Sequence, residues 1–206
     1  YNNRLGRKNA ISRIYNPVTF DLKKEPLTER KNIILTVGRL VPEKGTEYVA
    51  KIALDVLNKY PEWQWVILGD GAERDRLEKL ITENNLGGRL ILKGSVKNVD
   101  YYLRQASIFV LTSKLEGLGL SILEAREMKV PCVAFDVKMG SRELIHNDID
   151  GYIVNPFDCD EMARKIEKLI NDPELRECFA ENAFLCMDEF RIDKIVGQWK
   201  EVLKPL

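Results

Sequence analysis

Apolar runs of strand length alternate with segments of helical period from residue 33 onward, and this alternation constrains the fold more than any other feature. In the first helical segment, residues 48–57, apolar side chains recur at i, i+3 and i+4, which is typical of one helix face. The strand-length runs are IILTVG (33–38), QWVILG (64–69), RLILKG (89–94), SIFVLTS (107–113), PCVAFD (131–136) and GYIV (151–154).

These runs are apolar at successive positions, so both faces of each strand are expected to be buried. Such strands, regularly separated by helices, indicate a parallel sheet that is covered on two sides. Because crossovers between parallel strands are right-handed, the chain is predicted to form a doubly wound, Rossmann-like α/β layer. Two further helical segments, 173–188 and 191–203, are expected to follow that layer.

The composition is that of an ordinary globular protein. Of the 206 residues, 45% are hydrophobic and 31% charged, and 32 basic side chains balance 32 acidic ones. This zero net charge gives no sign of a nucleic-acid partner. Residues 1–30 are polar and turn-rich, so we interpret them as a linker that enters a domain spanning residues 31–206.

The cysteines and the single histidine offer little for a metal site. Cys132, Cys159, Cys178 and Cys186 show no C-x-x-C spacing, and we expect small buried or half-buried thiols in a reducing compartment, with no disulfide or zinc. His146 follows a predicted helix, where a surface or helix-terminal position is expected. No apolar run approaches the ~18 residues that a membrane span needs.

Charged residues and glycines follow the predicted strands. Ligands of an open parallel sheet bind at the carboxyl ends of its strands, and Gly38, Arg39 and Lys44 follow the first one. A guanidinium and an ammonium near a helix start suit a phosphate or diphosphate. For this pair alone a solvated loop is the favoured interpretation, and the spacing is not that of a Walker motif.

The stretch EGLGLSILEA, residues 116–125, places glutamates on both sides of a glycine-rich turn. Gly117 and Gly119 would let the backbone approach a ligand closely. The helix expected to begin near Leu120 would direct unpaired N–H groups at an anion. Glu116 and Glu124 would then bind hydroxyl groups; the alternative is that both are solvated surface charges.

Several segments together resemble the C-terminal, donor-binding domain of retaining glycosyltransferases of the GT-B type, the group 1 or family 4 enzymes. The resemblance covers the chain from about Asn16 to its end. The segments that carry it are YNPV (15–18), VGRLVPEKG (37–45), GDGAERDRLEKL (69–80), LKGSV (92–96), YYLRQASIFVLTSKLEGLGLSILEA (101–125) and VPCVAFDVKMGSRELIHNDIDGYIV (130–154).

The resemblance implies a role for each matching position. Arg39 and Lys44 would hold the donor diphosphate and stabilise the leaving group in place of a metal ion. Glu116 would contact the donor sugar, and Glu124 the ribose hydroxyls. Residues expected to line the rest of the donor path, with the last two near the base, are Gly38, Gly117, Leu118, Gly119, Leu120, Gly94 and Val96.

The resemblance also implies a retaining hexosyltransferase of polysaccharide or glycoconjugate synthesis, with a nucleoside diphosphate sugar as donor. UDP is the default nucleotide, and no metal or other cofactor is expected. The acceptor glycan or glycolipid would bind an N-terminal domain that is missing here, so the chain is expected to be a fragment that is inactive alone. The expected location is cytoplasmic, with peripheral contact to the inner membrane face through that domain.

Two residues depart from the family pattern, and three other functions stay open. Leu118 stands where phenylalanine is common, and Lys129 where glycine is common. The alternatives are a nucleotide-sugar epimerase, a non-catalytic nucleotide-sugar-binding module and a purely structural Rossmann-like domain. The paired glutamates, together with Arg39 and Lys44, argue against the epimerase.

Overall fold

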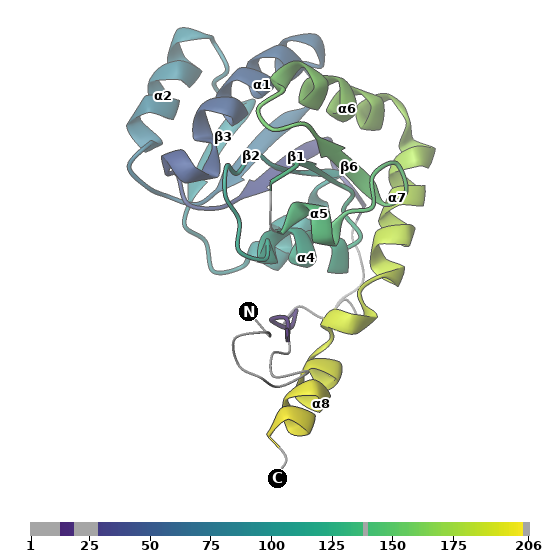
Figure 1. The fold of residues 1–206 in the computed structure, drawn as a ribbon. Helices are drawn as coiled ribbons and strands as arrows, with labels where there is room; N and C mark the ends of the chain where they lie inside the picture. The colour runs from purple at the N-terminus through teal and green to yellow at the C-terminus, as the bar shows by residue number, and fades with distance from the viewer. Residues whose placement is uncertain (1–12, 19–28, 138–139, 204–206) are drawn as a thin grey trace.

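A computed structural model of the chain describes residues 13–18, 29–137 and 140–203. Six parallel strands form one sheet in the order β3-β2-β1-β4-β5-β6 (Figure 1). This order is that of the doubly wound Rossmann arrangement, so the predicted fold class is confirmed. The strands are β1 (Ile33–Val37), β2 (Gln64–Leu68), β3 (Leu90–Gly94), β4 (Ile108–Leu111), β5 (Cys132–Phe135) and β6 (Gly151–Val154).

Two apolar clusters cover the two faces of this sheet. Ile34 and Val110 point into one cluster, whereas Leu35 and Phe109, their neighbours in sequence, point into the other. Successive side chains of a strand face opposite sides, so a strand covered on both faces must be apolar at every position. Trp63 also packs into the first cluster.

Helices cover each face of the sheet. The helices α1 (Thr46–Lys59), α2 (Arg74–Glu83) and α6 (Cys159–Asn171) lie on one side (Figure 1). The shorter helices α3 (Val99–Gln105), α4 (Leu120–Glu127) and α5 (Ser141–Leu144) contribute to the cluster on the other side. The structure therefore has three layers, helix, sheet and helix, as the periodicity predicted.

Two helices follow the layered part, and their ends reflect local sequence signals. The Asp172 side chain accepts a hydrogen bond from the Leu175 N–H and begins α7 (Pro173–Leu185), with Pro173 in the first turn. This helix was predicted over residues 173–188 but ends at Leu185. A short 3-10 helix, η4 (Asp188–Phe190), then leads to α8 (Ile192–Val202). None of the described helices is long and apolar enough to cross a bilayer.

Residues 13–18 lie beside the last helices of the chain. The Val18 N–H donates to the carbonyl of Phe190 at 3.0 Å, and the Tyr15 and Phe190 rings are 5.2 Å apart between centroids. Most of the linker predicted over residues 1–30 lies outside the described residues. The boundary at residue 30 therefore stays a prediction.

Arg30 joins the ends of two helices at the edge of the sheet where the strands begin. Its guanidinium donates to carbonyls at the C-terminal ends of α3 and α4, where helices leave acceptors unsatisfied. Burial lowers the pKa of this guanidinium to about 10. The accepting carbonyls, at 2.5–3.2 Å, are those of Leu103, Arg104, Ala106, Met128 and Lys129.

We expect Arg30→Ala to lower the free energy of unfolding by about 2–4 kcal/mol, because buried carbonyls would lose their charged donor. Urea unfolding followed by circular dichroism measures the change. The matched control is Arg164→Ala, at an exposed position on α6, with an expected change within about 0.5 kcal/mol. Equal unfolding midpoints for the two variants would contradict the assignment.

Candidate functional site

The centre of the sheet contains the point at which the chain reverses its winding. Strands β1 and β4 are neighbours, yet the helix after β1 covers one face and the helix after β4 covers the other. In open α/β sheets this divergence leaves a crevice at the carboxyl ends of the two strands. The segments after β1 and β4, residues 38–45 and 112–120, therefore border the candidate site.

The two segments approach each other closely. The Thr112 hydroxyl contacts the carbonyls of Lys44 and Gly45, each at 3.1 Å. Gly45 has φ +65°, and a Cβ there would lie 2.0 Å from the Thr112 carbonyl oxygen, so only glycine fits. The 3-10 helix η3 (Pro42–Lys44) thus ends against the exit of β4, which fixes the start of the Lys44 side chain.

Lys44 and Glu116, which are predicted to bind different parts of a donor, contact each other. The Lys44 Nζ lies 2.5 Å from Glu116 Oε1, and the Ser113 Oγ donates to the same oxygen at 2.6 Å. Glu116 is 9% exposed, whereas 26% of the Lys44 side chain is exposed, and Lys44 lines a small recess together with Gly38 and Arg39. A buried carboxylate thus anchors a cation that remains accessible.

Ser113 was not among the predicted site residues. Its role depends on the hydrogen bond to Glu116 three residues later, and the only sequence signal was its place at a strand exit. Gly140 was also missed. With φ +90°, a Cβ at Gly140 would lie 2.9 Å from the Glu116 Cβ, so a side chain there would displace the glutamate.

The glycine-rich turn exposes a row of backbone donors. Gly119 begins α4 with φ +82° and no side-chain cap, and the helix starts at Leu120, as predicted. Within the described ranges, no acceptor pairs with the N–H groups of residues 117–121. Leu118 packs partly against the second apolar cluster, whereas Leu120 is exposed. These N–H groups, which lack acceptors in the described part of the chain, could be satisfied by an anion.

The remaining predicted residues occupy different depths around this edge. Arg39 is exposed, and its side chain has no partner among the residues that the structure describes. Gly94 ends β3 at the same edge, with its carbonyl 2.8 Å from the Gly69 N–H, but β2 separates it from β1. Val96 packs partly against the second cluster. Gly94 and Val96 are thus less directly connected to the crevice than Arg39 is.

Glu124 lies on α4, half-buried. Burial raises the pKa of its carboxyl group, and no hydrogen bond or ion pair to a described residue offsets that effect. An ionised group in this state costs stability. A ligand that donates hydrogen bonds there would recover part of that cost.

The cysteines and the histidine agree only partly with the expectations. No disulfide forms among the four described cysteines; Cys132 and Cys159 are buried, as expected. Cys178 and Cys186 are exposed, so the expectation of buried or half-buried thiols is wrong for these two. Both lie on or at the end of the peripheral helix α7, one side of which faces solvent. His146 is at the surface, as predicted, with 58% of its side chain exposed.

We expect Glu124→Gln to raise the melting temperature of the ligand-free protein at pH 7 by about 1–3 °C. The raised pKa means that the folded state binds the Glu124 proton more tightly than the unfolded state does. The wild type therefore loses stability as pH rises through the ordinary glutamate range, whereas the variant lacks this loss.

Calorimetric scans between pH 4 and 8 measure the effect. The difference between variant and wild type should shrink toward the acid end, where both side chains are neutral. Glu62→Gln, at an exposed loop position, is the matched control and should leave the melting temperature unchanged. A Glu124→Gln protein that is less stable than the wild type at pH 7 would contradict the argument.

Comparison with known proteins places this arrangement in a family. Residues 18–185 match the family described as "Glycosyl transferases group 1". An uncharacterised glycosyltransferase of Haemophilus influenzae is 32% identical over 198 residues, which cover 96% of this chain and 56% of that protein. The alpha-D-kanosaminyltransferase of Streptomyces kanamyceticus is 41% identical over 153 residues, covering 73% of this chain and 39% of that protein.

Solved structures share the fold. A variant of TarM from S. aureus, in complex with Fondaparinux, alpha-GlcNAc-glycerol and UDP, superposes with a TM-score of 0.83 at 27% identity. The match covers 98% of this chain and 41% of that one. The chain spans 56% and 39% of the length of the two curated relatives named above. The strands, the crevice and the family match agree, and the chain belongs to the group 1 glycosyltransferases, as a Rossmann-like C-terminal domain of the GT-B type.

Proposed function

We propose that the crevice between β1 and β4 binds a nucleoside diphosphate sugar and stabilises its diphosphate as the sugar leaves. The observation that carries this proposal is the row of N–H groups at residues 117–121 that have no acceptor among the described residues, and this row lies on the same edge as Arg39 and Lys44. Backbone donors at a helix start and two cations suit a doubly charged leaving group. They would supply the stabilisation that a metal ion gives elsewhere, so we propose catalysis without a metal.

Lys44 can bind a phosphate without releasing Glu116. An ammonium group has three donors, and Glu116 Oε1 takes one of them. The remaining donors can reach phosphate oxygens, while Ser113 keeps the carboxylate in place. We therefore propose that the pair stays together during catalysis, with the cation oriented by the buried acid.

The free oxygen of Glu116 supports a role toward the sugar. Lys44 and Ser113 both contact Oε1, whereas Oε2 has no hydrogen-bond or ion-pair partner within the described part of the chain. A carboxylate oxygen accepts hydrogen bonds from hydroxyl groups and repels phosphate. We propose that Glu116 Oε2 binds a donor-sugar hydroxyl.

Glu124 would bind the other end of the donor. Its carboxylate is desolvated and has no partner among the described residues, and the two neighbouring hydroxyls of a ribose would satisfy both of its oxygens. Gly94 and Val96 would lie toward the base. UDP is the nucleotide present with the similar TarM variant, and we take it as the first donor nucleotide to test.

The complete reaction would need more chain than is present. In our proposal a partner domain binds the acceptor, a glycan or a glycolipid, and the product is a polysaccharide or glycoconjugate made with retention of configuration at the anomeric carbon. The isolated chain would then bind the donor weakly and transfer nothing. We further propose that the protein is located in the cytoplasm and that the partner domain provides any membrane contact.

We expect Arg39→Ala, Lys44→Ala and Glu124→Ala each to weaken UDP binding by about 10- to 100-fold, because each removes a charged or charge-assisted contact. Isothermal titration of the chain with UDP and with uridine separates the contributions. Arg39→Ala and Lys44→Ala should reduce the ratio of the affinity for UDP to the affinity for uridine. Glu124→Ala should lower the affinities for both ligands by the same factor.

Arg164→Ala, which removes a surface charge on α6, is the control and should bind both ligands like the wild type. A wild-type protein that binds UDP and uridine equally would refute the diphosphate site. Transfer of sugar to an acceptor by the chain alone would refute the requirement for a second domain.

A further inference from the structure

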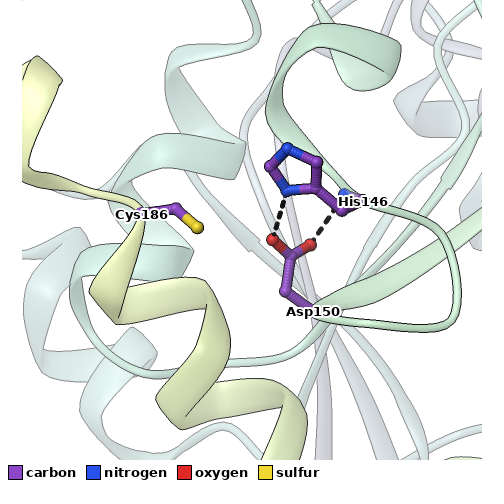
Figure 2. Close-up of side chains that lie close together, drawn as sticks. All are labelled: His146, Asp150 and Cys186. Carbon is purple, nitrogen blue, oxygen red and sulfur yellow. Dashed lines mark hydrogen bonds and ion pairs between the residues drawn. The ribbon is translucent and has the colours of Figure 1, made fainter.

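A second group of chemically active side chains lies at the opposite edge of the sheet from the crevice. His146 follows α5, Asp150 directly precedes β6, and Cys186 ends α7. Figure 2 shows their side chains gathered where these three segments meet. One ligand atom from each, a nitrogen, an oxygen and a sulfur, lies within 4.8 Å of the others.

Asp150 is held in position from several directions. It is fully buried, and its Oδ1 accepts the backbone N–H of His146 at 2.8 Å. Its Oδ2 accepts from Arg126 at 2.9 Å and lies 2.7 Å from the His146 Nδ1 (Figure 2). Arg126 also donates to the Ala183 carbonyl of α7. The carboxylate thus has a fixed orientation before any ligand arrives.

His146 and Cys186 are accessible from solvent. The His146 side chain is 58% exposed, and the Cys186 thiol is exposed and free. An ion could therefore reach the group without opening the core. A rigid acid with two adjustable, accessible ligands is an arrangement that can close around a small cation.

We propose that His146 Nδ1, Asp150 Oδ2 and Cys186 Sγ bind one Zn²⁺ ion, with solvent at the fourth position. Zinc accepts nitrogen, oxygen and thiolate ligands in a tetrahedral arrangement, whereas magnesium and calcium prefer oxygen alone. On binding, the thiol proton leaves to solvent, and the neutral imidazole binds through an unprotonated Nδ1 with its single ring proton on Nε2. Rotation of the two exposed side chains would bring the three atoms, now within 4.8 Å of one another, to zinc-bond length.

Arg126 is the feature that opposes a cation here, because its guanidinium already pairs with Asp150. A carboxylate has lone pairs for about four contacts, and those on Asp150 are only partly used. The Cys186 thiolate adds a second negative charge beside the ion. Arg126 would then act as the outer partner that orients a metal-binding carboxylate.

The proposed ion would stabilise the fold and take no part in sugar transfer. It lies where β6 begins, whereas Lys44 and Glu116 lie where β1 and β4 have ended. Bound zinc would tie the end of α7 to the loop before β6. The proposal is independent of donor binding, and it revises the sequence-based expectation that the cysteines bind no metal.

The test uses the metal-free chain with ZnCl₂ in equilibrium dialysis and thermal unfolding. The wild type should bind one zinc per chain and melt at a higher temperature with zinc than without it. Cys186→Ser and His146→Ala should each weaken zinc binding about tenfold or more. Cobalt(II) in place of zinc should give a sulfur-to-metal absorption band that Cys186→Ser abolishes.

Cys178→Ser is the matched control, because Cys178 is the other exposed thiol of α7. It should bind zinc and cobalt like the wild type. No Asp150 variant is used, since removing this acid would leave Arg126 buried without its partner. Absence of zinc binding, or equal binding by the wild type, Cys186→Ser and His146→Ala, would overturn the site.

Discussion

The pairing of β1 with β4 is the constraint on which the rest of the structure depends. These two strands lie side by side, but the chain leaves them toward opposite faces of the sheet, so their exits cannot pack over one another. Thr112 and Gly45 hold the two exits together at their base. The crevice above that contact is therefore a consequence of the winding, and side chains placed after either strand border it.

The crevice gathers groups that the protein alone does not satisfy. The N–H groups of residues 117–121 lack acceptors in the described structure, the Arg39 cation lacks a partner there, and burial disfavours the charge of Glu124. Such groups lower the stability of the unliganded protein and favour a ligand that completes them. By contrast, Lys44 and Ser113 both bind Glu116 Oε1, so this cation is oriented in advance.

The opposite edge of the sheet uses its buried cations for structure. Arg30 donates hydrogen bonds to the carbonyls at the ends of α3 and α4, while Arg126 links α4 to Asp150 and α7. Lys129 has a strained backbone at this edge. Its φ of +55° favours glycine, which explains why a lysine is unusual at this position. The side chain pairs with Glu181 of α7, which offsets part of that strain.

The sequence by itself determined the layers, most element boundaries and the glycine-rich turn, because periodicity and capping are local properties that burial and backbone sterics impose on neighbouring residues. It also placed Arg39, Lys44, Glu116 and Glu124 after the right strands. Only the tertiary structure decided that Lys44 contacts Glu116, 72 residues away, that Ser113 completes the pair, and that His146 and Asp150 meet Cys186. Those contacts depend on strand order and on where helices end in space, and neither leaves a local pattern in the chain.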